Sequence, residues 1–191
     1  MLGLIDDAAV AIKGGKVAWV GPEQELLREF RELAELDCAG RAALPGFVDA
    51  HTHLVFAGSR ADEFARRLRG ETYEEILAAG GGIHNTVEAT RGTDAMRLLD
   101  MAVQRAQRML GYGTTTVEIK SGYGLETETE TRQLEVAAAI DDELAIDVVP
   151  TFLGAHVIPK EFDGDRAGYV RLIIDEMLPA ARPLAKYCDV F

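Results

Sequence analysis

The sequence predicts an α/β protein, in which about the first four strands of a TIM-like (β/α) barrel follow a small β unit. Strand-like and helix-like segments alternate from Pro45 onward, which is typical of a parallel sheet. The first apolar segment ends in His51-Thr52-His53, as expected for a residue set at the mouth of a barrel. The chain has 191 residues, whereas a complete barrel needs about 250. We therefore expect roughly half a barrel.

The small β unit is predicted for the first 43 residues. Residues 8–12 and 16–20 are short apolar segments, and two glycines between them favour a hairpin turn, because glycine accepts the positive φ that such turns need. Apolar residues at helical spacing predict a helix over residues 24–33. Residues 42–44 are a further candidate strand. The unit is expected to bury little apolar surface by itself.

The barrel elements are predicted from β-branched runs and from helical spacing. The predicted strands are residues 47–51, 114–119 and 147–153, with a fourth strand that begins near Tyr187. The predicted helices are residues 72–79, 83–90, 94–110, 127–142 and 169–178, the last of which should stop at Pro179.

Two of these helices have an apolar face that should pack on the sheet. In residues 94–110 the predicted face is Met96, Leu99, Val103, Ala106 and Leu110. In residues 127–142 it is Leu134, Ala137 and Ala138.

Composition and charge argue against several classes of partner. Hydrophobic residues make up 48% of the chain and charged residues 27%, which is typical of a globular domain. The net charge of −12 argues against nucleic acid or an anionic membrane surface as a partner. No apolar run is long enough to cross a bilayer, and no signal-peptide pattern follows Met1. Cys38 and Cys188 are predicted to be free thiols in a reducing cytoplasm.

The most informative short pattern is the pair His51 and His53. Side chains alternate along a strand, so residues two apart project from one face, and two neutral imidazoles there can share a metal ion. Borderline metals such as Zn or Fe suit imidazole ligands. Two ordinary turn histidines are the alternative, but the Pro-Gly before the strand favours the metal site. Asp49 shares this face, either as a partner that orients an imidazole or as a polar strand-end residue.

Two candidates follow the later strands. Tyr123 lies between glycines that let the backbone turn sharply and present the ring; the alternative is an exposed turn tyrosine. His156 follows the third strand, where it can donate to an oxygen that becomes negative during hydrolysis, an interaction worth about 3 kcal/mol of the barrier. Its alternative is a loop histidine bonded to a backbone carbonyl. Of Glu118 and Lys120, one is expected to face the barrel interior.

Two more candidates lie between the first and second strands. Arg60 has a planar guanidinium that can hold a carboxylate through two parallel hydrogen bonds. It can instead pair with Asp62 or Glu63 on the surface. His84 lies at the start of a predicted helix, and contact with a ligand at the barrel mouth stays open for it.

Several longer motifs carry a family resemblance. Residues 45–53 (PGFVDAHTH) are similar to the first barrel strand of the amidohydrolase superfamily. Five further motifs narrow the resemblance, and they are residues 51–60 (HTHLVFAGSR), 80–84 (GGGIH), 112–116 (YGTTT), 120–126 (KSGYGLE) and 151–156 (TFLGAH). In this order they resemble the imidazolonepropionase family over nearly the whole chain.

This resemblance implies a hydrolase that opens the ring of 4-imidazolone-5-propanoate to N-formimidoyl-L-glutamate in histidine degradation. It implies one Zn or Fe ion, held by His51 and His53 with a His and an Asp from later strands, that lowers the pKa of a water molecule. Arg60, Tyr123 and His156 take substrate-binding positions, and His156 is also the catalytic residue. His84 is predicted as a fourth substrate contact.

The resemblance also bears on organisation and setting. Residues 1–43 become part of a small β-sandwich domain, and residues 44–191 become the first half of the barrel. The chain is expected to be an N-terminal fragment that is inactive by itself. The expected partner is the small-molecule substrate, with no nucleic acid and no membrane, and the expected location is the cytoplasm. A homodimer of the complete enzyme is left open. The alternatives are another metal-dependent cyclic-amide or aminopyrimidine hydrolase and a non-catalytic half-barrel.

Overall fold

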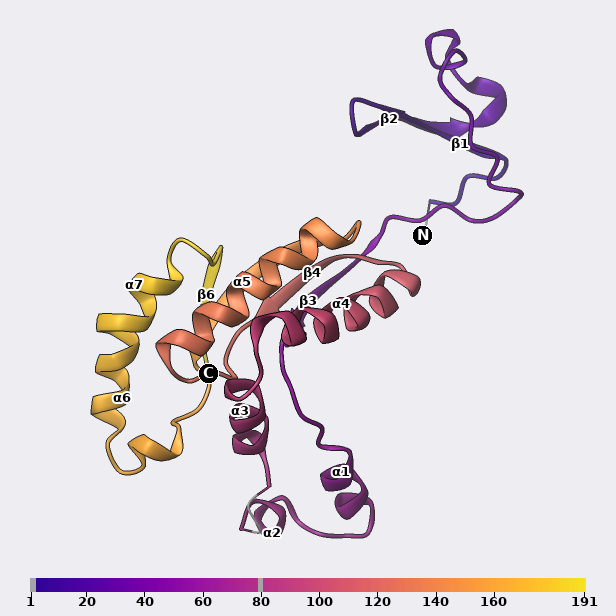
Figure 1. The fold of residues 1–191 in the computed structure, drawn as a ribbon. Coiled ribbons are helices and arrows are strands. Elements are labelled where there is room, and N and C mark those ends of the chain that lie inside the picture. Colours follow the sequence, from indigo (N-terminus) through magenta and orange to yellow (C-terminus); the bar gives the residue numbers. More distant parts are fainter. Residues whose placement is uncertain (1–2, 79–80) are drawn as a thin grey trace. The chain divides into compact units, whose positions relative to one another are not determined.

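The computed structural model describes residues 3–78 and 81–191 of the chain (Figure 1). Their contacts divide the chain into two units, Met1–Pro45 and Gly46–Phe191, and each is described by itself. The domain assignment 1–43 and 44–191 stays a prediction. None of the helices in the described ranges is long and apolar enough to cross a membrane.

The first unit contains the expected hairpin. Strands β1 (Ala8–Lys13) and β2 (Lys16–Pro22) pair antiparallel. The two turn glycines have φ of +60° and +72°, which fits the left-handed turn that a two-residue hairpin needs. The sheet of this unit has two strands within the described residues, so the β-sandwich stays a prediction.

Two sequence predictions for this unit are wrong. The helix predicted over residues 24–33 is replaced by two single 3₁₀ turns, Glu23–Glu25 and Arg28–Phe30, neither of which contains a buried residue. A short amphipathic helix draws its stability from packing on a core, and this small unit provides little core. Residues 42–44 form no strand within the described part, and the side chain of Leu44 is 70% exposed.

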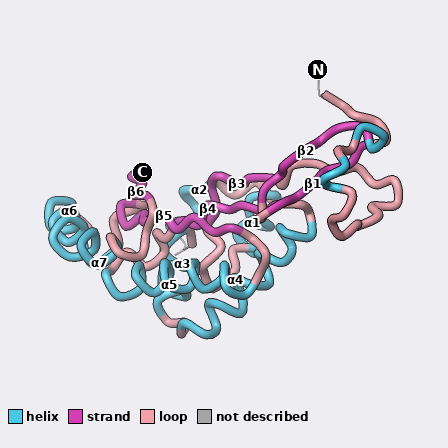
Figure 2. Tube along the Cα trace, turned by 90° about the horizontal axis from the view of Figure 1, so that it is seen from above, coloured by secondary structure: helices cyan, strands magenta, loops and turns pink. Residues whose placement is uncertain are grey.

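The second unit is built on the four predicted strands. They are β3 (Phe47–Thr52), β4 (Thr114–Lys120), β5 (Asp147–Ala155) and β6 (Tyr187–Val190). They form one parallel sheet in chain order, β3-β4-β5-β6. Figure 2 shows this sheet as a curved row of strands with helices on one side. This α/β arrangement is consistent with the predicted partial barrel.

The helices connect the strands much as the spacing predicts. They are α1 (Ala61–Leu68), α2 (Tyr73–Ala78), α3 (Ile83–Arg91), α4 (Ala95–Gly111), α5 (Thr127–Glu143), α6 (Arg166–Leu172) and α7 (Leu178–Ala181). Asp94 caps α4, because its carboxylate accepts the Arg97 N–H. Ala79 and Gly80, within the predicted 72–79 helix and the glycine motif, lie outside the described residues.

The core lies between the sheet and helices α4 and α5. Val117 and Ile119 of β4 are fully buried against Ala102 and Ala106 of α4 and against Ile140 of α5. Small residues on α4 let this helix approach the sheet closely, and the apolar surface that is removed from water drives the packing.

The predicted faces of α4 and α5 need correction. On α4, Ala106 is buried as predicted, and Leu99 and Val103 are partly buried against the core, whereas Met96 is 80% exposed. Leu98 and Ala102, which the prediction leaves out, are also fully buried, because the face turned to the sheet is centred on them. On α5, Leu134 and Ala137 are buried as predicted, and Ala138 is exposed.

Pro179 does not stop the last helix. The helix starts at Arg166, passes through a π-helical segment, Ile173–Met177, and continues as α7 past Pro179 to Ala181. A proline inside a helix lacks the N–H for the regular hydrogen bond. Because the π-helical segment already interrupts the regular bonding pattern just before it, the proline is accommodated there.

Candidate functional site

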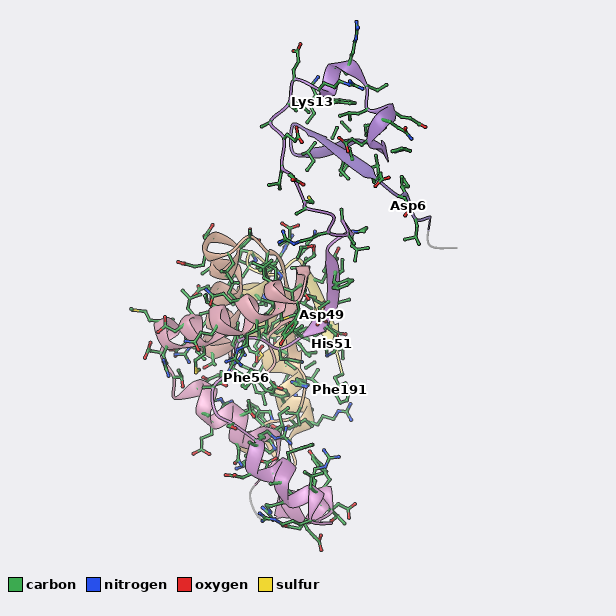
Figure 3. All side chains as sticks on the ribbon, turned by 90° about the vertical axis from the view of Figure 1, so that its right-hand side faces the viewer. Asp6, Lys13, Asp49, His51, Phe56 and Phe191 are labelled. Atoms are coloured by element: carbon green, nitrogen blue, oxygen red, sulfur yellow. The ribbon has the colours of Figure 1, made fainter. Side chains whose placement is uncertain are left out.

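The ends of three neighbouring strands bring four candidate side chains together. His51 lies in β3 (Figure 3), His53 directly follows it, Tyr123 follows β4 and His156 follows β5. The ring centroid of His53 lies 5.6 Å from that of His51, 5.0 Å from that of Tyr123 and 4.9 Å from that of His156. The rings of Tyr123 and His156 are 5.5 Å apart. The carboxyl ends of parallel strands are where barrel enzymes collect reacting groups.

His53 is a buried imidazole whose environment favours the neutral ring. Burial, followed by the charges of His156 and His51, lowers the pKa of His53 to about 4, so its ring is neutral and keeps a lone pair for a cation. Among the described side chains, none lies within hydrogen-bond reach of its buried Nδ1. An unpartnered buried polar atom is costly, and a metal ion near this ring is one way to offset that cost.

The donor set around His53 is small. Within residues 3–78 and 81–191, no group of three or more His, Cys, Asp or Glu side chains is arranged to hold a metal ion. Within these residues, His51 and His53 are therefore two candidate ligands and not a complete set. The carboxylate of Asp49 accepts the backbone N–H of His51 at 3.3 Å, so this contact supports the strand backbone and not an imidazole.

His156 is held in one tautomer by the backbone. Its Nδ1 lies 2.8 Å from the carbonyl oxygen of Gly122. A carbonyl can only accept, so Nδ1 carries the proton in this arrangement, and Nε2 has the lone pair in the neutral ring. The two alternatives for His156 are therefore compatible. Nδ1 is bonded to a backbone carbonyl, and Nε2 has no part in that bond.

Tyr123 and Arg60 lie within electrostatic reach of each other. Burial raises the pKa of the Tyr123 hydroxyl, and the positive charge of Arg60 partly opposes this rise. Arg60 itself is 40% exposed in its side chain, and its Nε donates to the Glu63 carboxylate at 2.8 Å. The surface pair with Glu63 is therefore formed. The other Glu63 oxygen accepts the backbone N–H of Gly82 at 2.9 Å.

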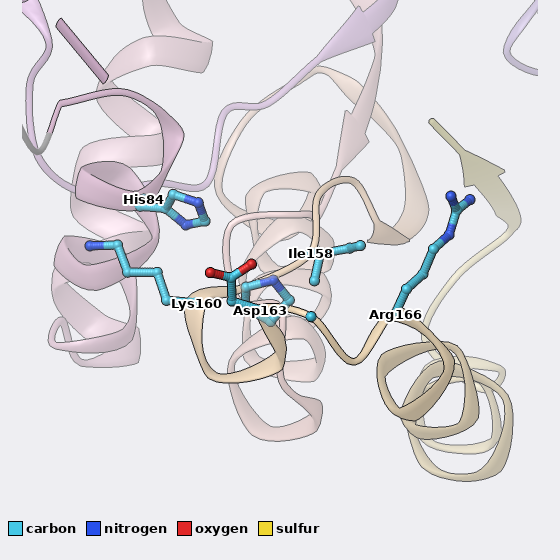
Figure 4. Close-up of a pocket in the computed structure, with 7 residues that line it drawn as sticks. His84, Ile158, Lys160, Asp163 and Arg166 are labelled. Carbon is cyan, nitrogen blue, oxygen red and sulfur yellow. The ribbon is translucent and has the colours of Figure 1, made fainter. Parts of the chain in front are cut away.

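His84 lies in a different place. It lines a surface pocket of about 420 Å³ together with residues of the loop after β5, among them Lys160 and Asp163 (Figure 4). Burial, followed by the charge of Lys160, lowers the pKa of His84. Within the described part of the chain, no ring contact joins His84 to the cluster of His51, His53, Tyr123 and His156.

Charged side chains form a network on the interior face of the sheet, where the sequence predicted only one of Glu118 and Lys120. The ammonium of Lys120 donates to Glu118 at 3.0 Å and to Asp189 at 2.9 Å, and Thr151 donates to Glu118 at 2.7 Å. Glu118 and Lys120 therefore share a face, as residues two apart in a strand must, instead of only one of them facing the interior. Burial lowers the pKa of Lys120, but its hydrogen bonds to Asp189 and Glu118 outweigh this and raise it.

The loop after His53 is held by side chains that the sequence analysis missed. Arg105 of α4 donates to the carbonyls of Leu54 and Phe56 at 2.7 and 2.8 Å. Gln133 of α5 donates to the carbonyl between them, that of Val55, at 2.7 Å. Three successive carbonyls are thus satisfied by two helices behind the sheet, which fixes the path of the chain as it leaves the histidine pair.

Comparison with known proteins agrees with the motifs. No family model matches the chain. A curated protein named imidazolonepropionase from Chloroflexus aggregans is 49% identical over 181 residues, which cover 95% of this chain and 42% of that protein. One of the same name from Geobacillus kaustophilus is 48% identical over 196 residues, covering 100% and 46%. One from Haloarcula marismortui is 50% identical over 191 residues, covering 97% and 45%.

The extent of these matches defines the relationship. They cover nearly all of this chain, and the chain spans about half the length of the curated relatives it matches. Identity near one residue in two over such a length confirms the resemblance that the six motifs indicate. The chain is therefore a homologue of the imidazolonepropionases over nearly all of its own length and about half of theirs.

Proposed function

We propose that this chain supplies about half of the active site of an imidazolonepropionase, a hydrolase that opens the ring of 4-imidazolone-5-propanoate to N-formimidoyl-L-glutamate. The observation that carries the proposal is the cluster of His51, His53, Tyr123 and His156 at three strand ends. The sequence identity of about 50% to proteins of that name supports it. The rest of the site would come from the remaining half of a complete barrel, and residues 1–43 would belong to a small β-sandwich domain.

His51 and His53 would hold one Zn or Fe ion. The residues fit such an ion because His53 is neutral and its buried Nδ1 lacks a partner among the described side chains, and because imidazole suits both metals. The ion, when bound, supplies Lewis-acid activation of water and of the ring carbonyl. Two imidazoles are half of a tetrahedral ligand set, so two further ligands are proposed from the other half of the enzyme.

Tyr123 and His156 would bind the imidazolone ring. The Gly122 carbonyl holds His156 Nδ1, and this bond fixes the orientation of the ring and leaves Nε2 for the substrate. In the imidazolium form, in which Nδ1 and Nε2 both carry protons, Nε2 would donate to the carbonyl oxygen as it becomes negative, which is the catalytic role proposed for His156. Tyr123 packs between His156 and Phe56 and would close the apolar side of the site.

Arg60 would hold the propionate. Glu63 engages its Nε, so the edge formed by the two terminal nitrogens can meet a carboxylate in a two-pronged pair. His84 lines the pocket beside Lys160, and it would contact the outer part of the substrate from there. The proposed setting is the cytoplasm, with the small molecule as partner and without nucleic acid or membrane, and a homodimer is proposed for the complete enzyme.

A direct assay tests this function. A completed enzyme, made by joining this chain to the remaining half of the Geobacillus kaustophilus relative, is expected to open 4-imidazolone-5-propanoate when Zn or Fe is supplied. It is expected to leave a cyclic amide and an aminopyrimidine unchanged. The 191-residue chain assayed alone should give no turnover, because it supplies only two of the four proposed metal ligands.

The alternatives have their own signatures in the same assay. Hydrolysis of the cyclic amide or the aminopyrimidine, with no ring opening of the imidazolone, would assign the chain to another amidohydrolase. A folded, metal-loaded enzyme that acts on none of the three compounds would favour a half-barrel without catalysis. Turnover by the purified 191-residue chain would refute the proposed division of the site.

A further inference from the structure

Helix α5 carries a buried carboxylate that the proposed chemistry does not use. Glu130 is 1% exposed. Its two oxygens accept three backbone N–H groups of the loop after β4, from Gly122 at 3.0 Å, Gly124 at 2.8 Å and Leu125 at 2.7 Å. A buried carboxylate is costly to desolvate unless it is fully bonded, and here the bonds all go to one loop.

That loop carries Tyr123, and its peptide groups are held one after another. Glu130 holds the N–H on each side of Tyr123, while Gln133, one helical turn further along α5, accepts the N–H of Tyr123 itself at 3.2 Å. On the opposite side of the loop, the Gly122 carbonyl meets His156 Nδ1 at 2.8 Å. The loop is thus clamped between α5 and the ring of His156.

The backbone of the loop does not adopt this path by preference. Gly122 has a φ of +106° and Leu125, a residue with a side chain, has a φ of +56°. A Cβ at Gly122 would lie 2.8 Å from His156 Nδ1, and one at Gly124 would lie 2.6 Å from the Glu130 backbone nitrogen. Glycine avoids these clashes, whereas Leu125 carries the cost of a left-handed backbone, and such a conformation persists only where the surroundings hold it.

We propose that Glu130 is a positioning residue, whose carboxylate fixes the loop so that Tyr123 and His156 face the site together. The role of these two residues toward substrate rests on the proposed function, whereas the hold of Glu130 on the loop can be measured without it. Glu130 touches neither substrate nor the reacting atoms in this account, so it acts through the loop alone.

The test uses Glu130→Gln, with Glu135→Gln on the exposed side of the same helix as the matched control. One carboxylate oxygen accepts from Gly124 and Leu125, and the other accepts from Gly122. A glutamine keeps one acceptor and presents N–H donors where the other was. The amide of Gly122 in the 191-residue chain is therefore expected to exchange its hydrogen at least about tenfold faster, relative to core amides such as those of Leu134 and Ile140. Glu135→Gln should leave it unchanged.

A second readout follows the site. The Nδ1–H proton signal of His156 should shift in Glu130→Gln, because its acceptor carbonyl is part of the released loop. In the completed enzyme, Glu130→Gln should lower kcat/KM about 10- to 100-fold, the range usual for residues that support a site from behind, with bound metal unchanged and with both kcat and KM affected.

The outcomes separate this inference from the proposed function. Unchanged exchange at Gly122, or an equal rise at every core amide, would overturn the positioning role. If Glu130→Gln does not fold, Glu130→Asp, which keeps the carboxyl group but shortens the reach, takes its place with the same expected exchange at Gly122. Failure of both variants to fold would make Glu130 a residue of the fold and would overturn the inference too. If no completed enzyme opens the imidazolone ring, the proposed function fails while the exchange result still decides the role of Glu130.

Discussion

Alanine in place of His51 or His53 is expected to cost a completed enzyme its bound metal and on the order of 10³-fold or more of its kcat/KM, since a metal ion supplies several kcal/mol of transition-state stabilisation. The ring centroids of His51 and His53 lie 5.6 Å apart at the end of one strand. Loss of either residue leaves three of the four proposed ligands. Metal content per chain and kcat/KM, measured on the same samples, check this result.

The control is a third histidine. His84 lies in the separate pocket beside Lys160, so His84→Ala should retain the metal even if substrate binding weakens. A double variant without His51 and His53 that keeps its full metal content would contradict the proposed ligation. Loss of metal in His84→Ala to the same degree would point to general destabilisation in place of ligand loss.

The second large effect is expected at Arg60. If its guanidinium holds the propionate, Arg60→Ala should lower kcat/KM for the natural substrate by on the order of 30- to 5,000-fold, since the loss of a buried charge-assisted pair costs about 2–5 kcal/mol. An imidazolone without the carboxylate should be affected far less. The measurement is the ratio of the two specificity constants in the wild type and in the variant.

Two further variants make the Arg60 test selective. Arg60→Lys keeps the charge and loses the two-pronged geometry, so it should also weaken binding of the natural substrate. Arg67→Ala removes an exposed arginine from α1, the helix that follows Arg60, and should leave the ratio as it is. An unchanged ratio in Arg60→Ala would mean that this residue serves its surface pair with Glu63 and does not read the carboxylate.

The parallel sheet could be predicted because its signal is local. Runs of β-branched and apolar residues set the four strands, and the helices between them repeat at helical spacing, so each element is specified by its own residues. The convergence of His53, Tyr123 and His156 follows from the same reasoning, since the ends of parallel strands meet at one edge.

The errors arise where a tertiary contact decides. The helix predicted over residues 24–33 has the spacing but no core to pack on, and the exposure of Met96 on α4 depends on how that helix lies against the sheet. Glu130 was missed although the signal was present. It lies on the helical stripe of Leu134 and Ala137, so a carboxylate is placed at a buried position, and such a placement indicates a bonded partner.

The roles of Arg60 and His84 depend on groups outside their own segments. Glu63, one of the two partners that the sequence offers to Arg60, also accepts the backbone N–H of Gly82, and local sequence does not predict this second contact. His84 lines a pocket with residues of the loop after β5, which lies far along the chain. Spacing alone does not place such residues.

The most direct test of the account is a metal titration of the completed enzyme. After removal of metal by a chelator, ring opening of 4-imidazolone-5-propanoate should be absent, and addition of Zn or Fe should restore N-formimidoyl-L-glutamate formation in proportion, up to one equivalent per chain. This is the result expected if His51 and His53 contribute to one hydrolytic metal site. Full formation of that product by the metal-free enzyme, or none at any metal loading of the folded enzyme, would contradict it.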